Sequence, residues 1–445
     1  MPSRTASTPR VAVLADSDTR WKWGALTAYR LQSDIRLDGY LLRGRATPTV
    51  RQLDEVGARA DSLREIRGVD FVRSVDRTRY DVIVLACVGG AVQAMLHGLA
   101  RAWSAGTPDA DGQHRPVVVT GYVGVVYEKL ADGLLLRHGA DVVLANSRHD
   151  ADRFREVYRG VGADDHSVVE CALPFLGGER YTGEHTPYTV VFAAQPSVPE
   201  SRADRGYLLR RAVEHARMHP DREVLIKLRS KPGEHTTHIE ELPYQKLAAK
   251  APGGLPANCR LVYGNMGEVL DRTDLMVTVS STAALESLHR GIPTAVLTDL
   301  GVREALGNHH FLGSGCLASW DELDAGHRPE PDRQWLARQG VAADGSYEKA
   351  FDAARARVTV LREAGLLPPL APYYTPRTAP GYLPGILARH GLDPQGEPLA
   401  GYDGAPEETG GLRRVARETV REAARGAYRH GVQRVAPAIR RWGQL

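Results

Sequence analysis

The residues Ser280, Ser281 and Thr282 form the strongest chemical signal in the sequence. They follow the apolar run DLMVTVS and precede AALESLHR, whose composition favours a helix. A strand that ends on small hydroxyl residues and leads at once into a helix presents free N–H groups and a positive dipole end to a ligand. The sequence therefore predicts a site for a phosphate or carboxylate, with the two serine hydroxyls as additional donors.

Glu286 lies one turn further along the predicted helix, where its carboxylate could accept hydrogen bonds from ribose hydroxyls. The alternative is that Ser281 or Thr282 only caps the helix and that Glu286 faces solvent, because serine and threonine are common helix caps. We favour binding, because ligands of open α/β sheets bind at the carboxyl ends of the strands.

A basic loop one βα unit earlier supports this interpretation. Lys227 and Arg229 end the run EVLIKLR at 223–229, and Lys231 and His235 follow. Such cations could neutralise the charge that develops on a leaving phosphate, and a protonated histidine could donate to it. The alternative is an ordinary surface loop, since lysine and arginine are mostly exposed.

Polar residues also follow two other strand-like runs. Gln195 and Ser197 come at the end of TVVFAAQPS, a position analogous to that of the serines. Asp16 and Asp18 directly follow VAVLA, where a carboxylate could remove a proton from an acceptor hydroxyl. We predict Asp16 or Asp18 as the base; an Asx turn or a helix cap is the alternative for both.

The strand-like runs recur at βα spacing in two series, which predicts two parallel α/β domains. A polar stretch with glycine and proline, 176–188, separates the series. We predict an N-terminal domain over 1–185, a second domain over 186–370, and a crossing loop with a basic helical tail over 371–445. The runs lie at 11–15, 81–86, 116–121 and 141–147 in the first series, and at 189–195, 223–229, 260–264, 274–280 and 294–297 in the second.

Composition narrows the class of protein. The formal charge is +3, which gives no general basis for binding nucleic acid. The four cysteines lie far apart, without metal-ligand spacing, which predicts neither a disulfide framework nor a structural metal and fits a reducing cytoplasm. No signal-peptide pattern and no apolar stretch of about 18 residues is found.

The C-terminal segment 411–445 differs from the rest in charge. It contains nine arginines and two glutamates, interspersed with apolar residues. This pattern is typical of a basic surface helix and makes an anionic membrane face a candidate partner. A disordered arm is the alternative, because Gly426, Gly431 and Pro437 weaken a helix.

Two of these segments carry a family resemblance. KLRSKPGEHTTH followed by VTVSSTAALESLHRGIP resembles the HP-type and SS-type motifs of bacterial sialyltransferases, polysialyltransferases and capsule ulosonic-acid transferases. Most of residues 10–400 also looks like an actinobacterial family of glycosyltransferases. One difference is that Pro232 precedes His235 here, so that no His-Pro dipeptide follows KLR.

The resemblance implies a GT-B-type fold, with two Rossmann-like domains whose parallel sheets face a cleft, and a metal-independent glycosyltransferase without a cofactor. By motif, His235, Ser280 and Ser281 would bind the phosphate of a CMP-sugar, and Asp16 or Asp18 would be the base. The DSD string at 16–18 also matches the DxD metal motif of GT-A enzymes, but no nucleotide-binding half precedes it, so we predict no metal there.

The expected reaction is the transfer of a sialic-type or other ulosonic acid from a nucleotide donor to a glycan or lipid-linked glycan of the cell surface. We expect a cytoplasmic protein that can bind the inner membrane face through its tail, with no nucleic-acid partner. Two alternatives stay open. One is a sugar-nucleotide 2-epimerase of the same architecture, whose corresponding turn typically reads Ser-Gly-Gly; the other is a non-catalytic glycan- or nucleotide-binding protein.

Overall fold

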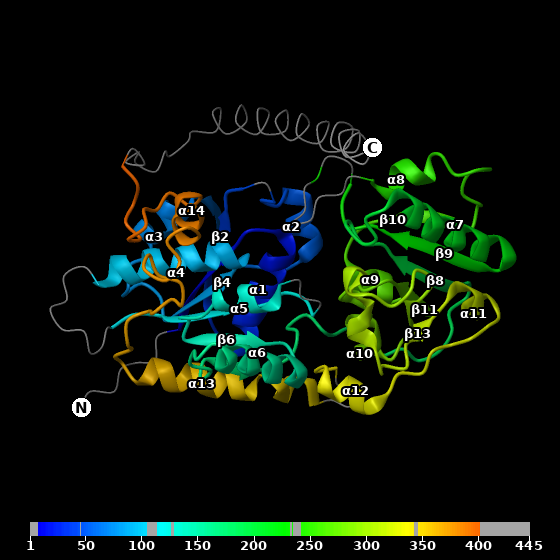
Figure 1. The fold of residues 1–445 in the computed structure, drawn as a ribbon. Coiled ribbons are helices and arrows are strands. Elements are labelled where there is room, and N and C mark those ends of the chain that lie inside the picture. Colours follow the sequence, from blue (N-terminus) through cyan, green and yellow to red (C-terminus); the bar gives the residue numbers. More distant parts are fainter. Residues whose placement is uncertain are drawn as a thin grey trace. The chain divides into compact units, whose positions relative to one another are not determined.

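The chain folds into two compact units, each built on its own parallel sheet (Figure 1). The first unit contains the chain up to Phe175 and the segment 346–400, and the second contains Leu176–Ala337. The predicted α/β class with two Rossmann-like domains is confirmed. The structure is a computed structural model that describes residues 8–44, 46–104, 114–125, 129–231, 234, 242–341 and 346–400.

The first sheet has seven parallel strands in the order β3-β2-β1-β4-β5-β6-β7. Strand order reverses between β1 and β4, which pair directly. In doubly wound sheets this switch point opens a crevice at the carboxyl ends of the strands. The strands are β1 Arg10–Ala15, β2 Arg36–Leu42, β3 Ser62–Ile66, β4 Val82–Ala86, β5 Val117–Gly121, β6 Val142–Ala145 and β7 Val168–Glu170.

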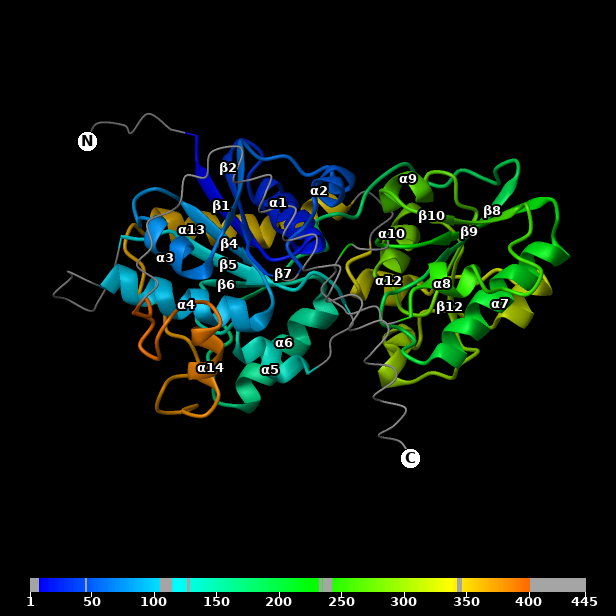
Figure 2. The same cartoon turned by 90° about the horizontal axis from the view of Figure 1, so that it is seen from above.

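Helices cover both faces of this sheet (Figure 2). α1 and α13 pack together on one face, and α3, α4 and α14 pack together on the other. The helices are α1 Asp18–Leu31, α2 Val50–Val56, α3 Gly68–Ser74, α4 Gly89–Ser104, α5 Leu130–Leu135, α6 Arg148–Gly160, α13 Asp352–Glu363 and α14 Leu383–Ala388, with the 3-10 helix η3 at Ser346–Phe351.

The start of α1 is fixed by its sequence. The Ser17 hydroxyl caps the helix by accepting from the Arg20 amide, which satisfies one of the free first-turn donors. Trp21 and Trp23 are fully buried, and at Gly24 an added Cβ would lie 2.6 Å from Val13 Cγ1. The helix therefore lies close against the strands, with its N-terminus at their carboxyl edge.

The second sheet has six parallel strands in the order β10-β9-β8-β11-β12-β13. The switch point lies between β8 and β11, which are neighbours. The strands are β8 Tyr188–Ala193, β9 Arg222–Lys227, β10 Cys259–Val262, β11 Leu275–Thr278, β12 Thr294–Leu297 and β13 Leu317–Ala318.

Two separate apolar cores cover this second sheet. α7, α8 and α11 contribute to the larger core, and α9 and α10 to the smaller one. The helices are α7 Arg202–Met218, α8 Tyr244–Ala248, α9 Met266–Leu270, α10 Ala283–Arg290, α11 Trp320–Asp324 and α12 Arg333–Arg338, with the 3-10 helices η1 Glu304–Leu306 and η2 Asn308–Phe311.

The linker before β8 belongs to the second unit, whereas we had expected the N-terminal domain to extend to residue 185. The buried Asp274 carboxylate accepts hydrogen bonds from the backbone of His185 at 2.8 Å and of Thr189 at 2.7 Å. Arg290 donates to the Gly177 carbonyl at 2.8 Å. These contacts hold both ends of the linker against β11 and α10.

The segment 346–370 was expected in the second domain but packs on the first sheet. α13 contacts α1, β5, β6 and β7, and its Ala354 and Val358 are buried. The Tyr347 hydroxyl also donates to the Leu173 carbonyl at 2.6 Å. Leu173 lies 174 residues earlier in the chain, and local sequence carries no signal for this packing.

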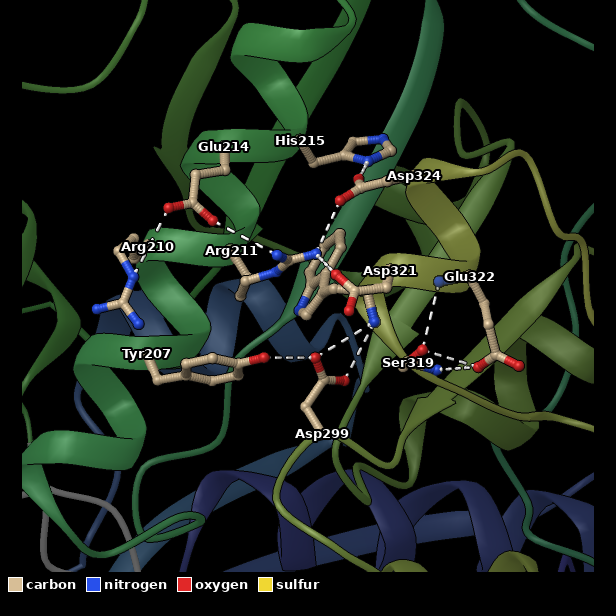
Figure 3. A network of polar contacts seen from close by, with 11 residues as sticks. Tyr207, Arg210, Arg211, Glu214, His215, Asp299, Ser319, Asp321, Glu322 and Asp324 are labelled. Atoms are coloured by element: carbon tan, nitrogen blue, oxygen red, sulfur yellow. Dashed lines mark hydrogen bonds and ion pairs between the residues drawn. The ribbon is translucent and has the colours of Figure 1, made fainter.

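A polar network joins α7 to α11 in the second unit (Figure 3). Arg211 donates to Asp321 at 2.6 Å and to Asp324 at 2.8 Å, and the buried His215 places Nδ1 2.6 Å from Asp324. Arg222 lies 3.4 Å from His215 Nε2. A guanidinium can only donate, so Nε2 is the acceptor and Nδ1 carries the proton that Asp324 accepts.

This network predicts a loss of stability in mild acid. Burial lowers the pKa of His215, although Asp324 opposes the shift. The unfolded chain therefore binds a proton more readily than the folded one, and the unfolding free energy should fall as pH drops below about 6.5, by at most about 1.4 kcal/mol per pH unit for this histidine. His215→Asn keeps an N–H donor but cannot titrate, so its melting temperature should depend less on pH between 7.5 and 5.5.

His166 offers a matched control, because its exposed ring contacts Asp164 and its pKa is raised rather than lowered. His166→Asn should leave the acid-induced loss unchanged. An identical pH dependence in His215→Asn and in the wild type would contradict the assignment.

The remaining expectations concern cysteines and membranes. All four cysteines are free and buried. Among the residues that the structure describes, no helix combines the length and apolar character needed to cross a bilayer. The predicted basic tail lies outside the described residues, so its membrane role stays a prediction.

Candidate functional site

The predicted anion site lies at the switch point of the second sheet. β8 and β11 run side by side with Thr278 opposite Ala193, and the Thr278 hydroxyl donates to the Ala193 carbonyl at 3.0 Å. The two chains that leave these strands carry Gln195 and Ser280. The carboxyl ends of β8 and β11 thus bring together residues that are 85 positions apart.

Gln195 and Ser280 are locked to each other. The Gln195 side chain accepts from the Ser280 amide at 2.9 Å and donates to the Ser280 hydroxyl at 3.2 Å. That hydroxyl in turn donates to the Leu306 carbonyl at 2.6 Å. Ser280 is therefore engaged inside the protein and positions the turn, whereas the sequence had suggested that it is a direct ligand.

The first turn of α10 leaves few donors unused. The Ser281 amide donates to the Thr278 hydroxyl at 3.2 Å, and the Ser281 hydroxyl accepts from the Ala283 amide at 3.3 Å. Ser281 thus acts as the cap. Thr282 follows it with helical dihedral angles, φ −56° and ψ −23°. Among the described residues, neither its amide nor its hydroxyl has a hydrogen-bond partner.

A buried arginine that the sequence analysis missed holds the loop after β8. Arg205, on α7, donates to the carbonyls of Gln195 at 3.1 Å, Pro196 at 3.0 Å and Pro199 at 3.3 Å. Its guanidinium lies 4.4 Å from the ring centroid of Tyr244. Arginine in a helix usually indicates a surface position, so only the fold reveals that it supports the site.

The basic strand end lies beside the same edge. Lys227 is paired with Ala193 across β8 and β9, and its buried ammonium donates to the Leu228 carbonyl at 2.8 Å. Arg229 is half-buried and Lys231 is exposed. The structure thus places Lys227 next to the switch point, while the predicted His235 lies outside the described residues.

Two further predicted ligands differ in their surroundings. Glu286 lies in the first turn of α10 and is buried. The alternative that Glu286 faces solvent is therefore wrong. Ser197 is half-buried in the loop that Arg205 holds. Both residues stay candidates as ligands.

The predicted base lies at the switch point of the first sheet. One Asp16 carboxylate oxygen accepts from Arg20 at 3.0 Å, and the other accepts from the Val88 amide at 2.9 Å. Val88 lies just after β4, so Asp16 ties the end of β1 to the start of α4. Both Asp16 oxygens are thus engaged by donors, and the residue joins these two strand ends.

Asp18 is placed differently. It is the first residue of α1, is half-buried, and has one carboxylate oxygen 3.3 Å from the neighbouring Thr19 hydroxyl. A carboxylate at a helix N-terminus is stabilised by the dipole and by free amides.

Two groups of described residues have the composition of a metal site, and one of them, Asp164, Asp165 and His166, lies largely at the surface. His215, His219 and Asp324 offer ligand atoms within 4.8 Å of one another. Two guanidiniums, those of Arg211 and Arg222, already contact Asp324 and His215, and they would repel a cation. We therefore assign this cluster to the packing of α7 against α11.

The chain matches one family model over most of its length. The model, described as "Putative glycosyltransferase (DUF6716)", covers residues 11–360. No curated protein matches the chain.

Solved structures show a likeness in fold. A UDP-N-acetylglucosamine 2-epimerase from Rickettsia bellii has a TM-score of 0.51 at 10% identity, over 80% of this chain and 96% of that one. The S. aureus MnaA–UDP structure has a TM-score of 0.48 at 12% identity, over 77% of this chain and 94% of that one. The spinosyn rhamnosyltransferase SpnG has a TM-score of 0.40 at 14% identity, over 79% of this chain and 96% of that one. The first of these shows that the two-unit fold is shared.

Proposed function

This chain belongs to the glycosyltransferase family whose model it matches, and from that premise we propose that it transfers a sugar from a nucleotide donor to a glycan acceptor. The donor site is assigned to the second unit and the base to the first. The observation that carries the proposal is the lock between Gln195, Ser280 and Leu306, which holds the N-terminus of α10 at the switch point.

The donor phosphates would bind at the start of α10. The Thr282 amide and hydroxyl supply donors, and the helix dipole supplies a partial positive charge. Lys227, Arg229 and Lys231, at and after the end of β9, would add positive charge toward the leaving phosphate. Ser281 and Glu286 complete the site, with Glu286 assigned to the ribose hydroxyls. His235 keeps its proposed role as a donor to phosphate.

The base is assigned to Asp18, with Asp16 as the residue that positions it. Deprotonation of an acceptor hydroxyl requires a carboxylate oxygen that the hydroxyl can reach. Both Asp16 oxygens already bind donors that join β1 to α4. Asp18 lies one residue beyond the Ser17 cap, at the N-terminus of α1, where the helix dipole stabilises the carboxylate form that a base requires.

A narrower proposal concerns the sugar. The KLRSKPGEHTTH and SSTAALES segments resemble those of enzymes that use CMP-linked ulosonic acids, so we propose a sialic-type or related acid as the donor sugar and a cell-surface glycan as the acceptor. No metal or other cofactor takes part in the proposed reaction. Binding to an anionic membrane face through residues 411–445 is part of the same proposal.

The product of the reaction tests the proposal. The purified full chain would be incubated with CMP-, UDP-, GDP- and TDP-sugars and a panel of oligosaccharides, and the products identified by mass spectrometry. Transfer predicts an acceptor that gains the mass of one sugar residue, with release of one nucleotide. Recovery of every donor and acceptor unchanged would contradict the proposal.

A second candidate function is the 2-epimerisation of a sugar nucleotide. It is favoured by the likeness to the Rickettsia bellii 2-epimerase, and it is disfavoured by Ser-Ser-Thr at 280–282, where such enzymes typically have Ser-Gly-Gly. The same incubation separates the two functions. An epimerase would change the configuration of UDP-N-acetylglucosamine without an acceptor, and NMR of the sugar ring would detect that change.

A further inference from the structure

The Pro- and Tyr-rich segment after α13 folds back onto the first unit and carries an exposed aromatic group. Tyr374 and Tyr382 lie with ring centroids 5.4 Å apart at an angle of 77°. Tyr382 is 42% exposed. An exposed tyrosine is unremarkable by itself, so its surroundings decide what it can do.

One carboxylate fixes both rings. Asp132, in the first turn of α5, accepts from the Tyr374 hydroxyl at 3.1 Å and from the Tyr382 hydroxyl at 3.0 and 3.2 Å. A carboxylate has about four acceptor sites, so room for about one further donor remains. The two rings are thus held in place before any ligand arrives, which lowers the entropic cost of binding.

The segment itself is firmly attached. The Tyr374 carbonyl accepts from His97 on α4 at 2.9 Å. Tyr373 packs edge-on against Tyr374 and against His138, with centroid distances of 5.3 and 6.0 Å. Prolines restrict the backbone further; they stand at positions 368, 369, 372, 376, 380 and 384.

Two glycines leave the surface beside Tyr382 open. A Cβ added at Gly381 or Gly385 would meet no atom within 4 Å, and neither residue has a positive φ. Neither packing nor backbone conformation therefore requires glycine at these positions. Gly385 even lies within α14, where glycine costs about 1 kcal/mol relative to alanine, and it is three residues from Tyr382, on the same face.

The open surface lies near the strand ends that carry the predicted base. α14 packs on α4, and a Cβ at Gly90 would lie 3.7 Å from Ile386. Two residues before Gly90, the Val88 amide binds Asp16. α14, which begins directly after Tyr382, therefore contacts the start of α4, just beyond the carboxyl end of β4.

We propose that Tyr382 and Tyr374, held by Asp132, form a platform that binds a pyranose ring of the acceptor. A pyranose has an apolar C–H face and hydroxyls around its edge, and an aromatic face beside a carboxylate matches both features. The proposal deepens the function proposed above, because it rests on a glycan acceptor and assigns that acceptor a subsite in the first unit.

The test uses the full chain and a panel of methyl glycopyranosides with the gluco, galacto, manno and N-acetylamino configurations. Saturation-transfer NMR should detect binding of at least one glycoside to the wild type. Tyr382→Ala should weaken that binding roughly tenfold, while Tyr382→Phe, which keeps the ring, should stay within about threefold. Gly385→Leu should also weaken it, by covering the open face, and should keep or raise the melting temperature.

Binding that persists in both Tyr382→Ala and Gly385→Leu would overturn the platform, and so would a wild type that binds no glycoside of the panel. Equal losses in the alanine and phenylalanine variants would show that the phenols only pin the segment, which also overturns it. Sugar transfer from nucleotide donors to the oligosaccharide panel is measured in parallel. Absence of transfer to the oligosaccharide panel would count against the proposed function, whereas glycoside binding reports on the platform alone.

Discussion

Replacing Asp18 with asparagine should slow sugar transfer about 10²- to 10⁴-fold, which is the range that general-base groups contribute. The amide keeps the size of the side chain and its contact with Thr19 but cannot take up the acceptor proton. We expect kcat to fall while the donor affinity and the melting temperature stay close to those of the wild type. Initial rates of nucleotide release with acceptor present, together with a thermal melt, provide the measurement.

Asp16→Asn is the matched comparison. Asp16 binds Arg20 and the Val88 amide, so its replacement leaves the Arg20 guanidinium without its carboxylate and should lower stability as well as activity. Full activity in Asp18→Asn would show that another group is the base. Full activity in both variants would exclude both aspartates as the base.

The second large effect is expected at Thr282, where proline should weaken donor binding about 10- to 100-fold. Proline removes both the amide and the hydroxyl that we assign to phosphate, and hydrogen bonds to a charged group contribute about 1.5–3 kcal/mol. The backbone angle of Thr282, φ −56°, suits proline, which is common at the first position of a helix. The helix should therefore persist while its ligand donors are lost.

Thr282→Val separates the two donors. Valine has the shape of threonine without its hydroxyl, so it keeps the amide and should lose only part of the affinity. A larger loss in the valine variant than in the proline variant would contradict the assignment of the amide.

The main strands of both sheets could be predicted because each is a short β-branched run. Strands such as β4 and β11 are buried throughout, and continuous apolar runs are typical of parallel sheets. Two of the strands that were missed, β2 and β3, lack this pattern. β2 contains Asp38 and Gly39, and four of the five residues of the edge strand β3 are exposed. Asp38 is stabilised there by Ser62 at 2.6 Å and Tyr80 at 2.9 Å, partners that only the fold brings close.

The site was predictable to the level of strand ends but not of individual contacts. That Gln195 and Ser280 follow neighbouring strands could be inferred from βα spacing, because parallel strands end at the same edge. That the Ser280 hydroxyl binds the Leu306 carbonyl depends on the loop after β12, which has no periodic pattern. Arg205 and the Asp132 platform were missed for the same reason, since each depends on residues that are distant in the sequence or in another element.

Titration calorimetry with CMP-, UDP-, GDP- and TDP-sugars, on the wild type and on Thr282→Pro and Thr282→Val, tests the central claim that the N-terminus of α10 is the donor site. The account predicts that one class of nucleotide binds the wild type with one site per chain, that valine weakens it moderately, and that proline weakens it about 10- to 100-fold at an unchanged melting temperature. Equal affinity in all three proteins, or no nucleotide binding to the wild type, would contradict it.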